Sequence, residues 1–179
     1  MKKIMFCTLM AWSCLSYAQE TETPPIERRD EVKINALLMI LGAIEVGYEH
    51  TLSHESAFGI TGLYGFDDDL GINYMITPYY RYYFGKKPAH GFFMEGFGTL
   101  NSVDDYVYEE YDPVNFYYNY EEKTITDFAL GIGLGAKWMT SKGVTLEINA
   151  GIGRNLFSGE EDRDFEIIGR GGISVGYRF

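Results

Sequence analysis

The sequence predicts an all-β fold, an eight-stranded antiparallel up-and-down transmembrane β-barrel. Near its end, apolar residues occupy every second position up to Phe179, whereas Arg170 and Arg178 fall on the opposite face. Period two is the period of a β-strand. One apolar and one polar face suit a membrane barrel, which meets lipid outside and is polar inside. The 21 glycines, 15 tyrosines and 12 phenylalanines agree with such a barrel, in which aromatic residues lie at the membrane interfaces.

Eight segments alternate in this way, and turn residues separate them. The predicted strands are residues 32–40, 44–52, 57–66, 72–84, 91–100, 125–139, 144–152 and 165–179. These lengths reach the roughly 9–11 residues that a tilted membrane strand needs. The alternative is a soluble β-sandwich or lipocalin-like barrel, which would expose its charged face to water. The polar face of residues 125–139 contains Gly131, Gly133 and Gly135, which suit a crowded barrel interior better than a solvent face.

Residues 1–18 are expected to form a secretory signal peptide. Lys2 and Lys3 precede an apolar stretch that is too short to span a membrane, and Ala18 ends a run of residues that suits cleavage. A membrane helix and a lipoprotein modified at Cys14 are the alternatives. Both cysteines of the chain fall within this signal, so we expect no disulfide in the exported protein.

The rest of the chain divides into two parts. Residues 19–31 are expected to form a flexible periplasmic segment, and residues 32–179 the outer-membrane barrel domain. With an even number of strands, both termini face the periplasm, and the longer, acidic connections at the other end face the cell exterior. The formal net charge of −11 argues against a nucleic-acid partner.

Three stretches carry a resemblance to a known group: ITPYYRYYFGKKPAHGFFMEGFG (76–98), TDFALGIGLGAKW (126–138) and GRGGISVGYRF (169–179). They resemble small outer-membrane β-barrel proteins of Gram-negative bacteria that carry a domain of unknown function, of the OmpX/OmpA-like eight-stranded type. The resemblance runs from about Lys33 to Phe179. It implies the fold and an outer-membrane location, and it implies no activity.

The inward faces of the predicted strands carry a balanced set of charges. Because an eight-stranded barrel is only wide enough for its own side chains, charges there must be paired. Mutual salt bridges that seal the lumen are the first interpretation, with Arg81 and Glu95 as inward neighbours on adjacent strands, and a narrow polar conduit or proton path is the alternative. The predicted lumen charge network comprises Lys33, Glu45, Glu49, Arg81, Glu95, Lys137, Glu147, Glu166, Arg170 and Arg178.

Two further sets of residues are candidates for contacts with partners. The predicted signal for the barrel assembly machinery comprises Ile173, Val175, Tyr177 and Phe179. Residues 103–122 are expected to extend two strands into a protruding hairpin with a turn at 112–115. Its tyrosines either contact an unknown extracellular ligand or form a girdle against lipopolysaccharide headgroups. The tyrosines in question are Tyr106, Tyr108, Tyr111, Tyr117, Tyr118 and Tyr120.

The sequence predicts no catalytic, cofactor or metal site. His50, His54 and His90 map to the periplasmic end, away from a surface nucleophile, and the glycine run at 131–135 lacks the helix of a phosphate-binding loop. The acidic connections could hold Ca²⁺, although without EF-hand spacing. We therefore expect a monomeric structural or surface-interaction protein among outer-membrane lipid and lipopolysaccharide. A narrow ion channel and a lipid-modifying surface enzyme are the alternatives.

Overall fold

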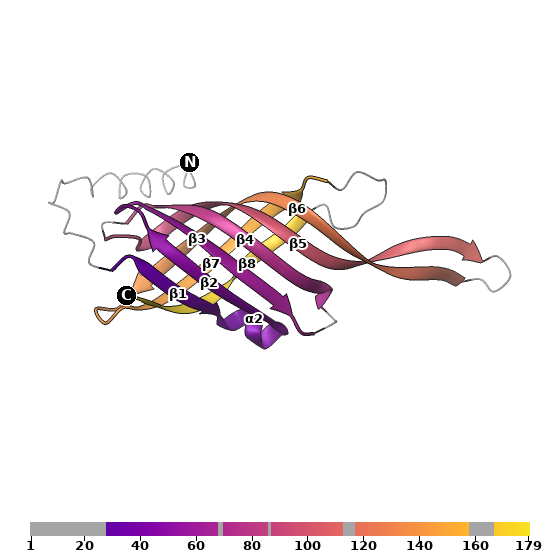
Figure 1. Cartoon of the computed structure of the whole chain (residues 1–179), viewed down its shortest axis with the longest axis horizontal. Helices are drawn as coiled ribbons and strands as arrows, with labels where there is room; N and C mark the ends of the chain where they lie inside the picture. The colour runs from indigo at the N-terminus through magenta and orange to yellow at the C-terminus, as the bar shows by residue number, and fades with distance from the viewer. Residues whose placement is uncertain (1–27, 68–69, 86, 113–116, 158–166) are drawn as a thin grey trace, which may run out of the picture.

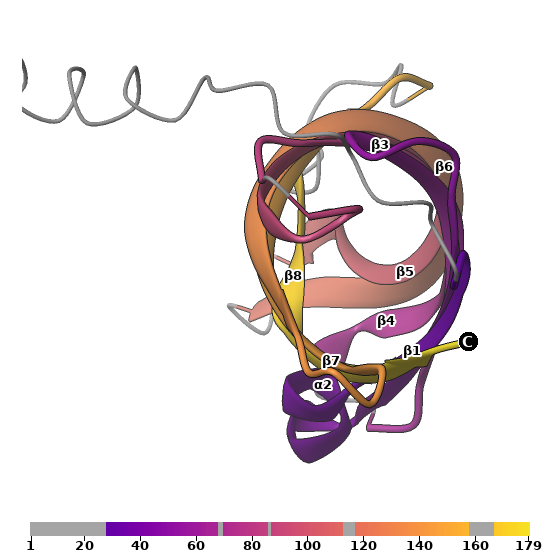
Figure 2. The same ribbon diagram turned by 90° about the vertical axis from the view of Figure 1, so that its left-hand side faces the viewer.

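The structure is a computed structural model, and it shows a closed barrel of eight antiparallel strands in chain order (Figures 1 and 2). β8 pairs with β1 and completes the circle. The predicted all-β, up-and-down, eight-stranded fold is therefore confirmed. The structure describes residues 28–67, 70–85, 87–112, 117–157 and 167–179. The predicted signal peptide, residues 1–18, lies outside them.

The elements follow the predicted order with one insertion. They are β1 (Asp30–Asn35), α2 (Ala36–Leu41), β2 (Ala43–Thr51), β3 (Ser56–Gly65), β4 (Ile72–Tyr83), β5 (Gly91–Asp112), β6 (Tyr117–Met139), β7 (Val144–Asn155) and β8 (Ile167–Arg178). The described helix is too short to cross a bilayer, and no helix in the described ranges is long and apolar enough to do so.

The predicted first strand is wrong at both ends. β1 begins at Asp30, so the last two residues of the expected flexible segment 19–31 belong to the barrel. It stops at Asn35, where the backbone turns into α2 instead of continuing to residue 40. The Asn35 side chain accepts a hydrogen bond from the Leu38 N–H at 3.2 Å and so caps the helix. Gly42, with φ of 104°, ends it in the left-handed region that glycine favours.

The outer surface of the barrel is apolar and its interior is polar. On β6, Ile132 and Leu134 are 68% and 61% exposed, whereas Lys137 on the opposite face is fully buried. A soluble protein has the reverse arrangement, with charges outside. This inverted pattern is that of a membrane-spanning barrel, in which lipid covers the apolar face.

The β5–β6 hairpin projects beyond the rest of the barrel, at the end opposite the C-terminus (Figure 1). The β4–β5 ladder stops at Val103 and the β6–β7 ladder starts at Ala129, whereas β5 and β6 remain paired out to Asp112 and Tyr117. The predicted extension of these two strands is confirmed. Its expected turn at 112–115 lies, apart from Asp112, outside the described residues.

Candidate functional site

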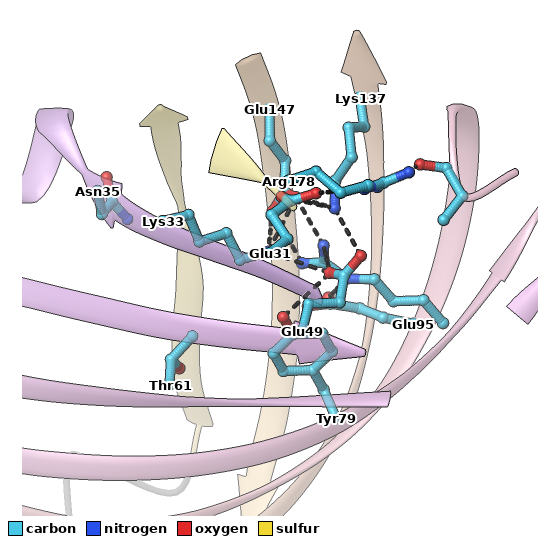
Figure 3. A network of polar contacts seen from close by, with 12 residues as sticks. Glu31, Lys33, Asn35, Glu49, Thr61, Tyr79, Glu95, Lys137, Glu147 and Arg178 are labelled. Atoms are coloured by element: carbon cyan, nitrogen blue, oxygen red, sulfur yellow. Dashed lines mark hydrogen bonds and ion pairs between the residues drawn. The ribbon is translucent and has the colours of Figure 1, made fainter. Parts of the chain in front are cut away.

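Charged side chains from several strands converge in the lumen (Figure 3), near the end of the barrel where β1 begins and β8 ends. Glu49 on β2 and Arg81 on β4 are both fully buried. Arg81 Nη1 donates to Glu49 Oε2 at 2.8 Å, and Arg81 Nε donates to Glu95 Oε2 at 2.8 Å. Arg81 and Glu95 are also direct partners in the β4–β5 ladder, so the expected inward neighbourhood of these two residues is correct.

Three cationic side chains form ion pairs with Glu147 on β7. Arg81 binds it with two hydrogen bonds, from Nη1 to Oε2 at 2.6 Å and from Nη2 to Oε1 at 2.8 Å. Lys33 Nζ lies 2.9 Å from Glu147 Oε2, and Lys137 Nζ lies 3.3 Å from the same oxygen. β1, β4, β6 and β7 are thereby joined across the lumen as well as around the wall.

Glu31 extends this network to the seam between β1 and β8. Its Oε2 accepts hydrogen bonds from Arg178 Nη2 at 2.8 Å and from Arg178 Nε at 3.1 Å. Its Oε1 lies 3.0 Å from Lys137 Nζ as an ion pair without hydrogen-bond geometry. Glu31 belongs to the segment that was expected to be flexible, so it is absent from the predicted network. The alternation of Glu31, Lys33 and Asn35 on one face of β1 was the signal that could have found it.

Arg170 and Glu45 form the edge of the network that faces the hairpin end. Arg170 Nη1 makes a short ion pair with Glu95 Oε1, and its Nη2 lies 3.9 Å from Glu45 Oε1. Glu45 Oε2 accepts a hydrogen bond from Asn35 Nδ2 at 2.7 Å. Arg170 and Glu45 retain 10% and 12% of their side-chain exposure, whereas those deeper in the lumen retain almost none.

Aromatic side chains pack among the charges and leave little room between them. The Tyr79 and Tyr83 hydroxyls donate to Glu49 at 3.1 and 2.9 Å. The Arg81 guanidinium lies 4.3 Å from the centre of the Tyr79 ring and 4.2 Å from that of Phe93. Cations over desolvated aromatic faces gain further stabilisation. We call this assembly of charges and aromatic rings the plug.

The plug holds nine of the ten predicted network residues in one connected set, and Glu166 lies outside the described residues. With Glu31 added, five cations face five carboxylates, so the formal charge of the plug is zero. This balance matters because each unpaired ion in a low-dielectric interior costs several kcal/mol. The cations are Lys33, Arg81, Lys137, Arg170 and Arg178, and the carboxylates are Glu31, Glu45, Glu49, Glu95 and Glu147.

The glycines of β6 make space for the plug. A Cβ atom on Gly131 would collide with the Phe97 ring, and one on Gly135 would collide with the Phe93 ring. A Cβ atom on Gly133 would lie 2.9 Å from Glu95 Cγ. The crowded interior expected from these glycines is therefore present.

The other predicted residues lie on the outside or at the ends. Ile173, Val175, Tyr177 and Phe179 are all exposed on the outer face at the end of the chain. The backbones of Tyr106, Tyr108 and Tyr111 lie on β5 and those of Tyr117, Tyr118 and Tyr120 on β6, while their side chains fall outside the described part of the structure.

The histidines lie at the end of the barrel where β1 begins and β8 ends. His50 Nδ1 lies 2.7 Å from Asp30 Oδ1 at the start of β1. The turns of His54 and His90 are adjacent, since the Ala89 N–H donates to the His54 carbonyl at 3.0 Å. Among the residues that the structure describes, no group of three or more His, Cys, Asp or Glu side chains is placed to hold a metal ion.

Comparisons with known proteins agree with this architecture. The model of a family described as "Protein of unknown function (DUF3575)" matches residues 4–172. The chain belongs to this family. A similar solved structure is the N-terminal β-barrel domain of Pseudomonas aeruginosa OprF, at 12% identity and a TM-score of 0.50, covering 85% of this chain and 96% of that one. At this identity the likeness shows the barrel fold alone. No curated protein matches this member of the DUF3575 family.

Proposed function

We infer that this chain is an outer-membrane barrel that carries no steady ion current and presents the β5–β6 hairpin at the cell surface. The closed state is supported above all by the complete burial of Glu49, Arg81 and Lys137 inside the lumen. An open path would have to separate these side chains. Separating a buried pair costs about 3–5 kcal/mol because it leaves an uncompensated charge.

The apolar outer face supports the location in a membrane. Export by the expected signal peptide and insertion by the barrel assembly machinery would bring the chain to the outer membrane, with both termini in the periplasm. The exposed residues of β8 up to Phe179 are the proposed signal for that machinery. Lipid and lipopolysaccharide are then the immediate surroundings of the barrel.

The hairpin supports a role in surface contact without catalysis. Between Val103 and Ala129 its strands leave the β4 and β7 ladders, so its outer edges extend past the neighbouring strands. Its sequence is rich in tyrosine and in acidic residues, and tyrosine offers a large contact area at a low entropic cost. The described histidines lie at the other end of the barrel, away from any substrate at the cell surface.

Conductance tests the closed lumen. The full protein, reconstituted in planar lipid bilayers, should show no steady current. A variant with Lys137→Ala and Glu49→Ala, which removes two central side chains of the plug, serves as the positive control. Steady current through the unmodified protein would overturn the closed state and favour the channel.

A hairpin replacement tests surface contact. Replacing residues 105–123 with Asn-Gly would join the paired residues Asp104 and Thr124 by a two-residue turn and leave the barrel ladders intact. Cross-linking on intact cells should recover surface partners with the full chain and lose them with the replacement. Recovery of the same partners with the full chain and with the replacement would rule out the hairpin as the contact surface.

A further inference from the structure

We propose that the lumen beyond the plug is a binding site for an uncharged alcohol with a short apolar tail, and that this ligand enters from the membrane beside α2. The site is a cavity of about 70 Å³, which we call the cup. A cavity needs roughly 10–15 Å³ per water, so the cup holds more than an isolated water. Its lining includes Leu38, Leu63, Met75, Ile168, Glu45 and Arg170.

Arg170, which lines the polar end of the cup, carries an unused donor. Arg170 is nine-tenths buried, and its Nη1 is taken by Glu95. Its Nε–H is buried and has no hydrogen-bond acceptor among the described residues. A buried donor without a partner is unfavourable, so an acceptor oxygen of a ligand would be bound here with a gain.

The charges at this end select an uncharged head group. Glu95 already neutralises Arg170, and Glu45 Oε1 lies 3.9 Å from Arg170 Nη2, too far for a hydrogen bond. A carboxylate on the ligand would face the charge of Glu45. A hydroxyl can instead accept from Arg170 Nε, once a side-chain movement opens this buried atom to the cup, and donate to Glu45 Oε1. The rest of the ligand would meet the apolar side chains of the cup, which fixes its tail as hydrocarbon.

The wall beside the cup lacks a continuous strand ladder. β1 ends at Asn35, opposite Ser174, so residues 167–173 of β8 pair with β7 alone. On the other side, residues 43–45 of β2 pair with β3 alone. α2 covers this interval on the outside of the barrel (Figure 2), and its Leu38 lines the cup.

This interval faces the apolar surroundings of the barrel. Ile40 and Met39 of α2 are 81% and 49% exposed. Asn35 Nδ2 links the two sides of the interval by donating to Glu45 Oε2 at 2.7 Å and to the Gly171 carbonyl at 3.2 Å. An apolar tail can therefore pass beneath α2 without breaking a β-ladder.

Two glycines provide a matched pair for testing this route. A Cβ atom on Gly169, which lines the cup, would meet no heavy atom within 4 Å, and the same holds for Gly96 on the far strand β5. A leucine at either position fits the backbone, but only Gly169→Leu places bulk beside the interval that α2 covers.

The experiment uses methyl NMR on the full protein in nanodiscs, with 1-octanol, octanoate and octane as probes. Met75 in the cup and Met94 on the outer face are the reporters. We expect a saturable shift of the Met75 methyl with 1-octanol, at least tenfold weaker binding of octanoate, and no saturable shift with octane. Met94 should respond only in proportion to the probe dissolved in the membrane.

The variants distinguish the site from its surroundings. Arg170→Lys keeps the charge but loses Nε–H, and we expect about fivefold weaker binding of 1-octanol, the loss of one net hydrogen bond. Gly169→Leu should weaken or slow binding at least threefold, and Gly96→Leu should not. Unchanged heat-modified migration shows that each variant is folded.

Three results would overturn the proposal. Met75 and Met94 could respond alike, which would mean membrane partitioning only. Octanoate could bind as tightly as 1-octanol, which would rule out selection for an uncharged head group. Gly96→Leu could weaken or slow the binding of 1-octanol as strongly as Gly169→Leu, which would rule out entry beside α2. None of these results bears on the absence of steady current. The proposal of a closed lumen and the proposal of a binding site in the cup can therefore be overturned independently.

Discussion

Arg81 and Glu147, 66 residues apart in the sequence, form a pair inside the lumen with two hydrogen bonds of 2.6 and 2.8 Å. The same guanidinium also binds Glu49 and Glu95, so one side chain serves carboxylates from three strands. Arg81 is therefore the residue whose loss should affect the plug most.

Replacing Arg81 with methionine should lower the free energy of unfolding by about 3–5 kcal/mol, because Glu49, Glu95 and Glu147 would remain buried with too few cations. Urea unfolding in lipid vesicles measures the loss. Adding Glu95→Gln should restore part of it, since the two changes remove one pair. Lys142→Met, in an exposed turn, is the control. Equal stability of Arg81→Met and the control would show that the lumen is wet.

Replacing Gly135 with valine should destabilise the barrel, whereas Gly62→Val should not. A Cβ atom on Gly135 collides with the Phe93 ring, while one on Gly62 meets no heavy atom within 4 Å. Overpacking of a filled interior costs about 1–3 kcal/mol. Heat-modified migration on gels and urea midpoints compare the two variants. Equal effects would argue against a filled lumen.

Trypsin added to intact cells should cut after Lys123 in the hairpin and leave Lys87 intact. Lys123 pairs with Asp105 in the part of the hairpin that projects from the barrel, and Lys87 lies in the turn between β4 and β5 at the opposite end. Mass spectrometry of the fragments identifies the sites. A cut at Lys87 with Lys123 intact would invert the proposed orientation.

Changing both Tyr177 and Phe179 to lysine should leave the chain in the periplasm as a substrate for proteases. Both side chains are exposed on the apolar outer face where the chain ends, and two charges there would oppose recognition and insertion into lipid. Fractionation and heat-modified migration report the outcome. The conservative variant Phe179→Trp should insert normally, and insertion of the lysine variant would rule out this signal.

His90 should titrate below the ordinary histidine pKa of 6.5. Its partial burial and the nearby Lys87 and Arg178 lower the pKa of the His90 ring. Because the unfolded chain binds the proton more tightly, the contribution of His90 to stability is full above pH 6.5 and decreases as the pH falls toward the folded pKa. NMR titration measures the midpoint, and Lys87→Gln should raise it. A midpoint at or above 6.5 would contradict this arrangement.

Alternation along the strands predicted which residues of the barrel face inward, because successive side chains of a strand point to opposite faces whichever strand lies beside it. Register shifts interrupt the pairing only between Ile72 and Tyr74 and between Tyr108 and Tyr111 in the described strands. Alternation could not predict α2: residues 36–41 are apolar throughout and carry no period, and the cap by Asn35 decides the outcome. Adjacent partners such as Arg81 and Glu95 follow from strand order. Contacts across the lumen, such as that of Lys33 with Glu147, depend on strand stagger and on side-chain conformation, which one sequence does not reveal.

The seam between β1 and β8 determines the order in which this barrel can fold. Every other pairing joins neighbours in the chain, so hairpins can form locally, whereas Glu31 and Arg178 are 147 residues apart. Among the described strands, closure is thus the one pairing between distant parts of the chain, and it carries the entropic cost of bringing the two ends together. Before closure, the curved sheet has two unpaired edges that can associate with other chains. Asp30 and Phe179 exchange backbone hydrogen bonds, so a short linker could join them. In a circular permutant built in this way, the β1–β8 pairing would be local. The non-local pairing would then be the one between the two strands that flank the new ends of the chain.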